Sequence, residues 1–266
     1  MALAENQVSM PTAAKFDQNY NSQYSYIAKV GYPMGMMYGF IYEGTYKYED
    51  FDKVGDTYTL KRNVPYFSSE SNTQPGMPKY ADLNGDGIID DNDRTMIGNG
   101  MPKHTGGFTN NFEYKGFDLS IFFQWSYGND VLNANRLFFE NSNKTRDLNQ
   151  YASYADRWTT ENPESNIPRA TDSGSNKVFS TRIIEDGSFL RLKTVSLGYT
   201  LPKQLTKKWK IDNARVFVAG QNLWTCTGYS GYDPEVSIRE GALTPGLDFS
   251  AYPRAYSISF GVNLGF

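Results

Sequence analysis

The sequence predicts an all-β protein, part of a transmembrane antiparallel β-barrel whose long loops carry short helices. Several runs of about ten residues alternate between apolar and polar side chains, which is the length of a tilted strand that crosses a bilayer. Aromatic residues make up 15% of the 266 residues, with 20 Tyr and 17 Phe, a content typical of the aromatic girdles of such barrels. The mean hydropathy is −0.57, and no apolar run approaches the roughly 20 residues of a membrane helix.

The clearest pair of strands lies at residues 106–114 and 117–127, which are joined by Lys115-Gly116. In the second run one face is apolar throughout, and it consists of Phe117, Leu119, Ile121, Phe123, Trp125 and Tyr127. The other face is polar except for Phe122, and it carries Asp118, Ser120, Gln124 and Ser126. Alternation of period two on both sides of a short turn predicts an antiparallel hairpin.

The last run has the most regular alternation. Its apolar residues are Tyr256, Ile258, Phe260, Val262, Leu264 and Phe266, and they alternate with Ser, Gly and Asn. A soluble sandwich strand could have the same pattern, but the barrel-like runs upstream favour the membrane interpretation. A strand of this kind that ends in Phe266 looks like the outer-membrane signal that the barrel assembly machinery recognises.

We count about six to eight strand-like runs in all. The others are residues 22–30, 36–42, 180–185, 189–200 and 213–224, whereas residues 1–21 are polar and without pattern. Between the runs, residues 129–158 show broken helical spacing that includes Leu148 and predicts one or two short helices, followed by a polar loop over residues 165–176. Residues 225–250 form a second long loop, and connections of such length are normally functional.

The run over residues 189–200 contains two cations on its apolar face. Arg191 and Lys193 alternate in step with Val195, Leu197 and Tyr199. We therefore predict that both cations lie near the outer end of the strand and extend their long side chains to water.

An oxygen-rich loop at residues 82–93 has the spacing of a calcium-binding loop. Its predicted ligands are Asp82, Asn84 and Asp86 at positions one, three and five, the carbonyl of Ile88 at seven, Asp90 through water at nine, and Asp93 at twelve. Gly87 at position six permits the sharp turn. Asp93 is shorter than the Glu of an EF-hand, and Pro75 and Pro78 are incompatible with a flanking helix pair. We predict a structural Ca²⁺ ion here; the alternative is a solvated Asn/Gly/Asp turn.

Composition narrows the classes of function. The net charge of −3 argues against binding of nucleic acid, and a single Cys and a single His exclude a disulfide framework and Cys or His metal clusters. The acids gather in turns and loops, with no two on one strand face, which argues against a glycoside hydrolase and predicts no enzymatic activity. Residues 1–5 have no signal-peptide character. A soluble calcium-dependent β-sandwich, serving as a carbohydrate-binding or adhesion module, remains the alternative.

A series of short motifs runs in one order along the chain. They are residues 31–33 (Gly-Tyr-Pro), 38–40 (Tyr-Gly-Phe), 82–87, 115–124, 158–163, 167–170, 189–202, 220–223 (Gly-Gln-Asn-Leu), 229–235 (Tyr-Ser-Gly-Tyr-Asp-Pro-Glu) and 252–254 (Tyr-Pro-Arg). In these motifs the chain resembles the SusC/RagA-type TonB-dependent outer-membrane transporters of Bacteroidetes-like bacteria.

This resemblance implies that residues 1–266 are the C-terminal portion of a barrel of about 22 strands, a fragment from which the signal peptide and plug domain are absent. It implies an importer of glycan oligosaccharides or peptides in the outer membrane, in contact with outer-membrane lipid. TonB would act on the missing N-terminal part, and a SusD/RagB-like surface lipoprotein would serve as a lid. The loops over residues 128–178 and 225–250 would then lie outside the cell.

Three rings near the second long loop are candidates for contact with substrate or lid. They are Tyr229, Tyr232 and Trp224. Each could stack on a sugar ring, and each could equally belong to an aromatic girdle or pack the loop.

Overall fold

The computed structural model describes residues 6–9, 24–141, 149–171, 178–238, 241 and 243–266. It divides into two compact units, which we describe separately. Unit 1 comprises Met1–Met101, Asp130–Glu185 and Ser237–Ala251, and unit 2 comprises Pro102–Asn129, Asp186–Val236 and Tyr252–Phe266. None of the helices in the described parts of the chain has the length and hydropathy that a membrane crossing requires.

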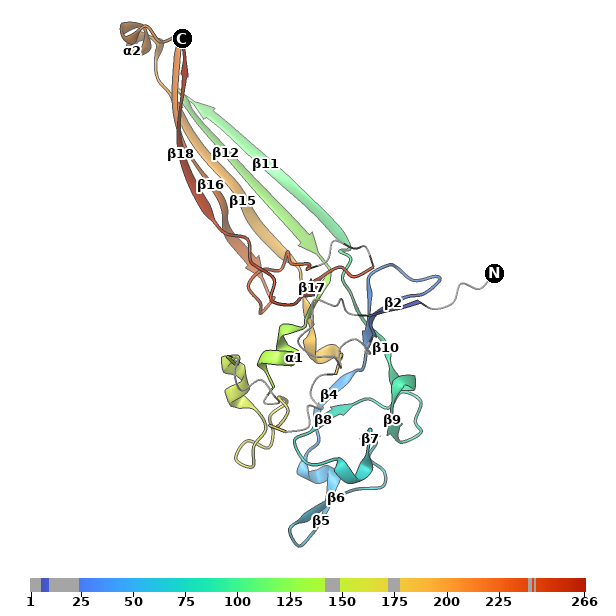
Figure 1. The fold of residues 1–266 in the computed structure, drawn as a ribbon. Coiled ribbons are helices and arrows are strands. Elements are labelled where there is room, and N and C mark those ends of the chain that lie inside the picture. The colour runs from blue at the N-terminus through green and yellow to red at the C-terminus, as the bar shows by residue number, and fades with distance from the viewer. Residues whose placement is uncertain (1–5, 10–23, 142–148, 172–177, 239–240, 242) are drawn as a thin grey trace. The chain divides into compact units, whose positions relative to one another are not determined.

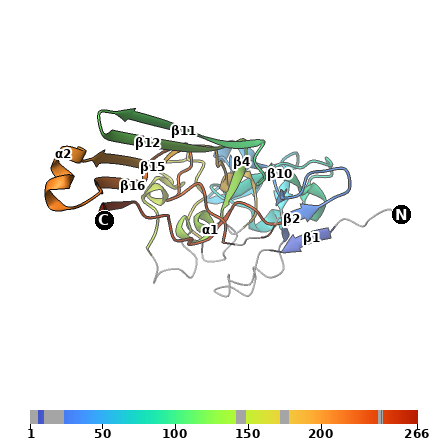
Figure 2. The same ribbon diagram turned by 90° about the horizontal axis from the view of Figure 1, so that it is seen from above.

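Unit 2 is built on a five-stranded sheet in which all neighbours are antiparallel (Figure 1). In spatial order the strands are β11 (His104–Tyr114), β12 (Phe117–Tyr127), β15 (Phe189–Thr200), β16 (Asn213–Thr227) and β18 (Ser257–Gly265). The connection between β15 and β16 contains two short helices, α2 (Lys203–Thr206) and η8 (Lys207–Trp209). The strands that alternation predicts at residues 106–127, 189–200, 213–224 and 256–266 are thus confirmed, side by side in one sheet (Figure 2).

One strand of this sheet contains a bulge that overturns a sequence prediction. On β15 the register with both neighbouring strands shifts at Lys193. Leu192 and Thr194 each have a partner on β12 and on β16, whereas Lys193 has no residue opposite it on either strand. Because a one-residue step reverses the face of a strand, Arg191 changes to the polar side, where it lies between Gln124 and Thr225. Its side chain is only 3% exposed. The prediction that Arg191 extends to water beside the apolar face is wrong.

Unit 1 is made of short strands in several small sheets. A four-stranded sheet contains β1 (Asn6–Ser9), β2 (Tyr24–Ala28), β3 (Met36–Gly39) and β10 (Thr95–Asn99), and a three-stranded sheet contains β14 (Ile184–Asp186), β13 (Asp130–Asn133) and β17 (Leu247–Asp248). The two-stranded sheets pair β4 (Tyr42–Thr45) with β8 (Pro78–Tyr80), β5 (Phe51–Val54) with β6 (Thr57–Leu60), and β7 (Tyr66–Phe67) with β9 (Ile88–Ile89). The helical turns are η3 (Tyr48–Asp50), η4 (Glu70–Asn72), η5 (Asp91–Asp93), α1 (Asn135–Phe139), η6 (Ala152–Asp156) and η7 (Thr181–Ile183).

The main core of unit 1 buries side chains that alternation assigns to barrel strands. Tyr26 on β2 and Met37 on β3 are both 0% exposed, and they pack with Leu132, Phe179 and Leu247 in one apolar cluster. The runs over residues 22–30 and 36–42 therefore contribute β2 and β3 to the four-stranded sheet of unit 1, and the expectation that they continue the barrel-like series is corrected. Alternation predicts a strand with one apolar face, and the same pattern suits lipid on one side or a protein core on one side.

Two smaller expectations have mixed outcomes. The predicted short helices correspond to α1 and η6. Residues 6–9 form β1, paired with β2, where the sequence shows no pattern. Leu148 and part of the polar loop over residues 165–176 lie outside the described residues.

Candidate functional site

The sheet of unit 2 has one apolar and one polar face. Directly opposed residues on neighbouring strands share a face, and one row across the sheet consists of Phe112, Leu119, Leu197, Val218 and Phe260. The adjacent row, which faces the other way, consists of Asn111, Ser120, Ser196, Ala219 and Ser259. A division into one apolar and one polar face is thus present on all five strands.

The apolar face is open to the surroundings. Phe260 is 82% exposed, and its neighbours Ile258 and Val262 on β18 are 57% and 62% exposed. A soluble sandwich would cover such a face with a second sheet, whereas here the alternating residues of β18 have no apolar layer over them in the described chain. Contiguous exposed apolar surface of this kind marks contact with a membrane or a protein partner.

The polar face holds a salt bridge that spans three strands. Arg215 on β16 donates through Nε to Asp118 on β12 at 2.9 Å, across Gly198 on the strand between them. A Cβ atom at Gly198 would meet both charged groups, so the missing side chain makes room for the pair. Phe122 and Phe217, two aromatic residues on this face, lie over glycines of neighbouring strands, Gly107 and Gly261 respectively.

A loop of unit 2 is bound to this sheet by five charged residues, which we call the ion network: Arg191, Lys193, Asp233, Glu235 and Arg254. Arg191 donates to Asp233 and, at 3.2 Å, to Glu235. Glu235 also accepts from Lys193 at 3.3 Å and pairs with Arg254 at 3.1 Å. The backbone N–H of Arg254 donates to Asp233 at 3.0 Å. The network therefore fixes the loop after β16 and the segment before β18 to the first residues of β15, at its Phe189 end.

The central carboxylate of the network is buried and ionised. Burial alone would raise the pKa of Asp233, but hydrogen bonds from Arg191 and from the backbone of Arg254 and Glu235 outweigh it, and the pKa lies below its usual value. Since the unfolded value is about 3.9, the ionised form stabilises the loop above that pH, and the contribution is lost as the pH falls through the lower folded pKa.

The lowered pKa of Asp233 predicts how the loop responds to acid. Protease cleavage within residues 228–236 should stay low from neutral pH down to about pH 4 and rise below it. Mass spectrometry of the fragments after a short acid-stable protease pulse measures this. In Asp233→Asn, cleavage should be high at every pH. Equal pH profiles for wild type and Asp233→Asn would contradict the assignment.

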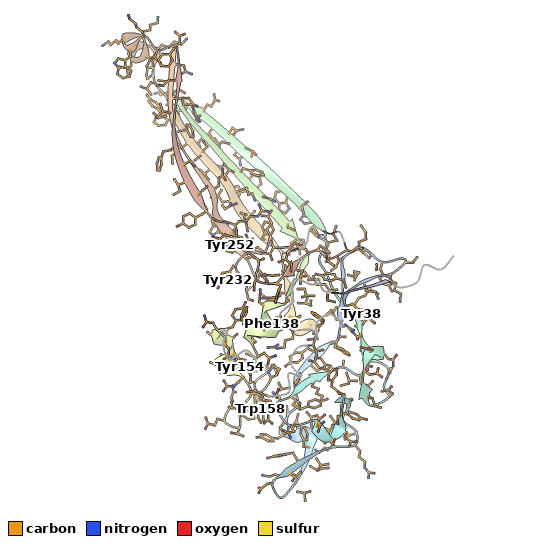
Figure 3. The ribbon with its side chains drawn as sticks, in the orientation of Figure 1. Tyr38, Phe138, Tyr154, Trp158, Tyr232 and Tyr252 are labelled. Carbon is orange, nitrogen blue, oxygen red and sulfur yellow. The ribbon has the colours of Figure 1, made fainter. Side chains whose placement is uncertain are left out.

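The three candidate rings differ in accessibility. Tyr232 is 85% exposed and Trp224 is 50% exposed, whereas Tyr229 is buried at 6% and packs against Gly231. A further ring, Tyr252, is 92% exposed and comes two residues before Arg254 of the ion network. Tyr232 directly precedes Asp233, so both exposed tyrosines are within two residues of the ion network in sequence. They lie at the end of the sheet away from α2 (Figure 1 and Figure 3). Neither Tyr252 nor the ion network was predicted as part of a site, although the motifs Asp233-Pro234-Glu235 and Tyr252-Pro253-Arg254 are present in the sequence.

The predicted calcium loop lies in unit 1 as a tight turn held by its own side chains. Asp82 accepts the N–H groups of Gly85 at 2.7 Å and Gly87 at 2.8 Å. Asp93, which is 0% exposed, accepts the N–H groups of Leu83 and Asp90, each at 2.8 Å. Asp93, at position twelve, thereby bonds to the backbone at positions two and nine of the loop.

The remaining predicted ligands also belong to this turn. Asp86 accepts the N–H of Ile88 at 2.8 Å and the amide of Asn84 at 3.0 Å, while Asp90 caps η5. Gly87 has φ +84°, as the predicted sharp turn requires. Over the described residues, no group of three or more His, Cys, Asp or Glu side chains is arranged to hold a metal ion. The oxygen donors are of the type that Ca²⁺ prefers, and the calcium site stays a prediction.

Comparisons with known proteins relate this geometry to a family. No protein-family model matches the chain. It is 34% identical over 247 residues to TonB-dependent receptor P3 of Formosa agariphila, covering 90% of this chain and 23% of that receptor. It is 28% identical over 198 residues to TonB-dependent receptor SusC of Bacteroides thetaiotaomicron, covering 74% of this chain and 18% of SusC.

Solved structures agree with these relatives. The structure of the RagAB peptide transporter matches with a TM-score of 0.68 and 25% identity, over 98% of this chain and 25% of that chain. A second RagAB structure, the peptide importer in its closed-closed state, matches with a TM-score of 0.66 and 27% identity, over 91% of this chain and 24% of that one. The chain thus spans about a quarter or less of the length of the proteins it matches.

These proteins are receptors and transporters of the outer membrane, not enzymes, which agrees with the predicted lack of catalysis. The strands of unit 2 are part of such a barrel, which five strands do not close. The soluble β-sandwich is therefore set aside. With one lipid-type face, one polar face and these relatives, the chain belongs to the SusC/RagA-type TonB-dependent receptors of the outer membrane.

Proposed function

We propose that this chain is the C-terminal portion of the barrel of a TonB-energised importer that takes up nutrients together with a SusD-like surface lipoprotein. The observation that carries the proposal is the five-stranded sheet with an exposed apolar face and a polar face crossed by Asp118 and Arg215. Such a sheet is a barrel wall: lipid meets the first face and the second lines a wet lumen.

The sheet needs further strands to work. Within the described chain, β11 and β18 each have one neighbour, so each leaves an edge of unpaired N–H and C=O groups. Unpaired edges are too costly in hydrocarbon, so the rest of a barrel of about 22 strands must supply their partners. In this proposal the plug domain and the TonB contact belong to that missing part, and β18, flanked by Tyr256 and Phe266, is the strand that the assembly machinery recognises.

Transport by such a protein is binding, lid opening and plug movement, with no bond made or broken by the protein. The end of the sheet that bears the long connections would face outward, because outer-membrane barrels have short periplasmic turns and longer extracellular loops. Tyr232 and Trp224, which are exposed near that end, are the rings we propose for contact with substrate or lid. The imported substrate would be glycan oligosaccharides or peptides; RagAB is described as a peptide transporter.

The test is affinity purification of the complete receptor that carries this segment from its native membranes. A surface lipoprotein should copurify in about equal amount, and deletion of the receptor should abolish uptake of either labelled oligosaccharides or labelled peptides. Deletion without effect on either uptake, with no lipoprotein recovered, would contradict the proposed function.

We further propose that the loop over residues 82–93 holds a structural Ca²⁺ ion. Loops of this type outside the cytosol bind with Kd of about 10⁻⁴ to 10⁻³ M, so extracellular calcium would fill the site. Asp86→Ala removes a central ligand and should raise protease cleavage over residues 80–100 in millimolar calcium to the level of wild type with chelator. Asp91→Ala is the matched control, since the Asp91 carboxylate is 92% exposed and is not among the predicted ligands. Equal resistance of wild type and Asp86→Ala in calcium would mean a solvated turn.

A further inference from the structure

The connection between β15 and β16 is a basic and amphipathic surface that the proposed transport does not use. Residues 201–212 contain four lysines, Lys203, Lys207, Lys208 and Lys210, against one acid, Asp212, in a chain whose net charge is −3. All four lysines are exposed, and none of their ammonium groups has an ion pair among the described residues. The charge of this segment is therefore uncompensated within the described chain.

Large apolar side chains lie among these cations. Trp209 is 61% exposed and Leu205 is 45% exposed, whereas Thr206 between them is buried at 1%. The segment is fixed to the sheet at both ends: Leu201 donates to the carbonyl of Ala214 and Asp212 to that of Gly265, each at 2.8 Å. The exposed Trp and Leu are thus held in place rather than carried on a free tail.

The segment lies at one end of the sheet that carries the exposed apolar face. It lies at the same end of the sheet as the C-terminus, beside the end of β18 (Figure 1). On the apolar face of this end, the rings of Phe117 and Tyr199 pack at a tilt with centroids 4.5 Å apart, and Tyr199 lies opposite Val216. Aromatic rings at the end of an apolar band mark the membrane interface.

This end is the periplasmic one if the sheet spans the outer membrane. Its connections are Lys115-Gly116 and residues 201–212, whereas those at the other end run over residues 128–188 and 228–256. Short turns face the periplasm in outer-membrane barrels. The headgroups at that level belong to phospholipids of the periplasmic leaflet. In several of these phospholipids the headgroup carries a net negative charge on its phosphate.

We infer that residues 201–212 bind the headgroups of anionic phospholipids in the periplasmic leaflet. The ammonium groups of Lys203, Lys207, Lys208 and Lys210 contact the phosphates, and Trp209 and Leu205 enter the interface beside the acyl chains. Basic clusters next to a membrane attract anionic lipid in proportion to the number of cations, and interfacial segments combine such cations with Trp and Leu. The inference rests on the membrane-spanning assignment of the sheet, which cysteine labelling of β18 tests separately.

The experiment uses the complete receptor in detergent, mixed with equal amounts of phosphatidylglycerol and phosphatidylcholine, and counts bound lipids by native mass spectrometry. Wild type should favour phosphatidylglycerol at least about tenfold. Changing all four lysines to Gln should remove the preference, and changing all four to Arg should keep it. A matched control changes Lys29, Lys53, Arg62 and Lys103 to Gln, which alters the net charge equally at exposed sites elsewhere. The control should keep the preference.

Loss of preference in the control as well, or its survival in the Gln variant, would overturn the inference. So would displacement of phosphatidylglycerol by inorganic phosphate at about 10 mM, since a free anion would then satisfy the lysines without acyl chains. If the Gln variant does not assemble, wild type alone decides. The preference of wild type for phosphatidylglycerol must fall several-fold as the ammonium acetate concentration rises from about 0.1 to about 0.5 M, because salt screens exposed charges. A preference that does not change with salt concentration would refute the lysine contacts.

Discussion

Phe260→Arg should destabilise the assembled receptor by about 2 to 4 kcal/mol, the cost of a cation on the lipid face near the bilayer midplane. Phe260 lies in the apolar row across the sheet and is 82% exposed, so in the membrane its ring meets hydrocarbon. The free energy of unfolding in lipid vesicles, from urea titration, measures this cost.

Ser259→Arg is the matched control for that change. Ser259 directly precedes Phe260 on β18 and belongs to the polar row with Ala219. Because adjacent residues of a strand face opposite sides, the new cation would enter a wet lumen and should cost far less. Equal losses for the two variants would contradict the assignment of faces.

Arg191→Met should cost about 3 to 5 kcal/mol, the loss that follows when a buried ion pair keeps only one partner. The Arg191 side chain is 3% exposed and that of Asp233 is 4% exposed, so the carboxylate would remain buried without its main donor. The free energy of unfolding in the same vesicles measures this loss, and protease cleavage over residues 228–236 locates it. The loop should open first.

Lys193→Met is the matched control within the ion network. Lys193 contacts Glu235 at 3.3 Å, and both side chains are 22% exposed, so solvent screens the pair. A pair of this kind contributes about 0 to 1 kcal/mol. If Lys193→Met matched Arg191→Met in its effect, the burial of Arg191 would not be the cause.

The long strands were predictable because lipid on one side requires an apolar face and the lumen on the other side permits a polar face. Phe117 to Tyr127 and Tyr256 to Phe266 alternate so regularly that strand, hairpin and faces follow from spacing alone. Arg191 was assigned to the wrong face because the bulge at Lys193 inserts one residue into β15. The residues of β15 before the bulge therefore alternate in the opposite phase to those after it, and no local signal in the sequence reveals the bulge.

Burial in unit 1 was not predictable for a different reason. Tyr26 lies in an alternating run as lipid-facing residues do, and only the partners that cover it, from residues distant in sequence, distinguish a core from a bilayer. The ion network likewise joins residues on β15 to residues some 42 and 63 positions later, since Arg191 meets Asp233 and lies close to the segment of Arg254. The spacing of residues within a short segment gives no information about contacts between residues so far apart in the sequence.

The most direct test of the account is labelling of single cysteines on β18 in native membranes. The variants Ile258→Cys, Phe260→Cys and Val262→Cys are made in the complete receptor after Cys226, the one cysteine of this chain, is changed to Ser. Ser259→Cys serves as the control on the lumen face. A lipid-dissolved reagent should modify positions 258, 260 and 262, and a water-soluble reagent should reach only position 259. Modification of all three by the water-soluble reagent would show that this face does not meet lipid, and the barrel assignment would be wrong.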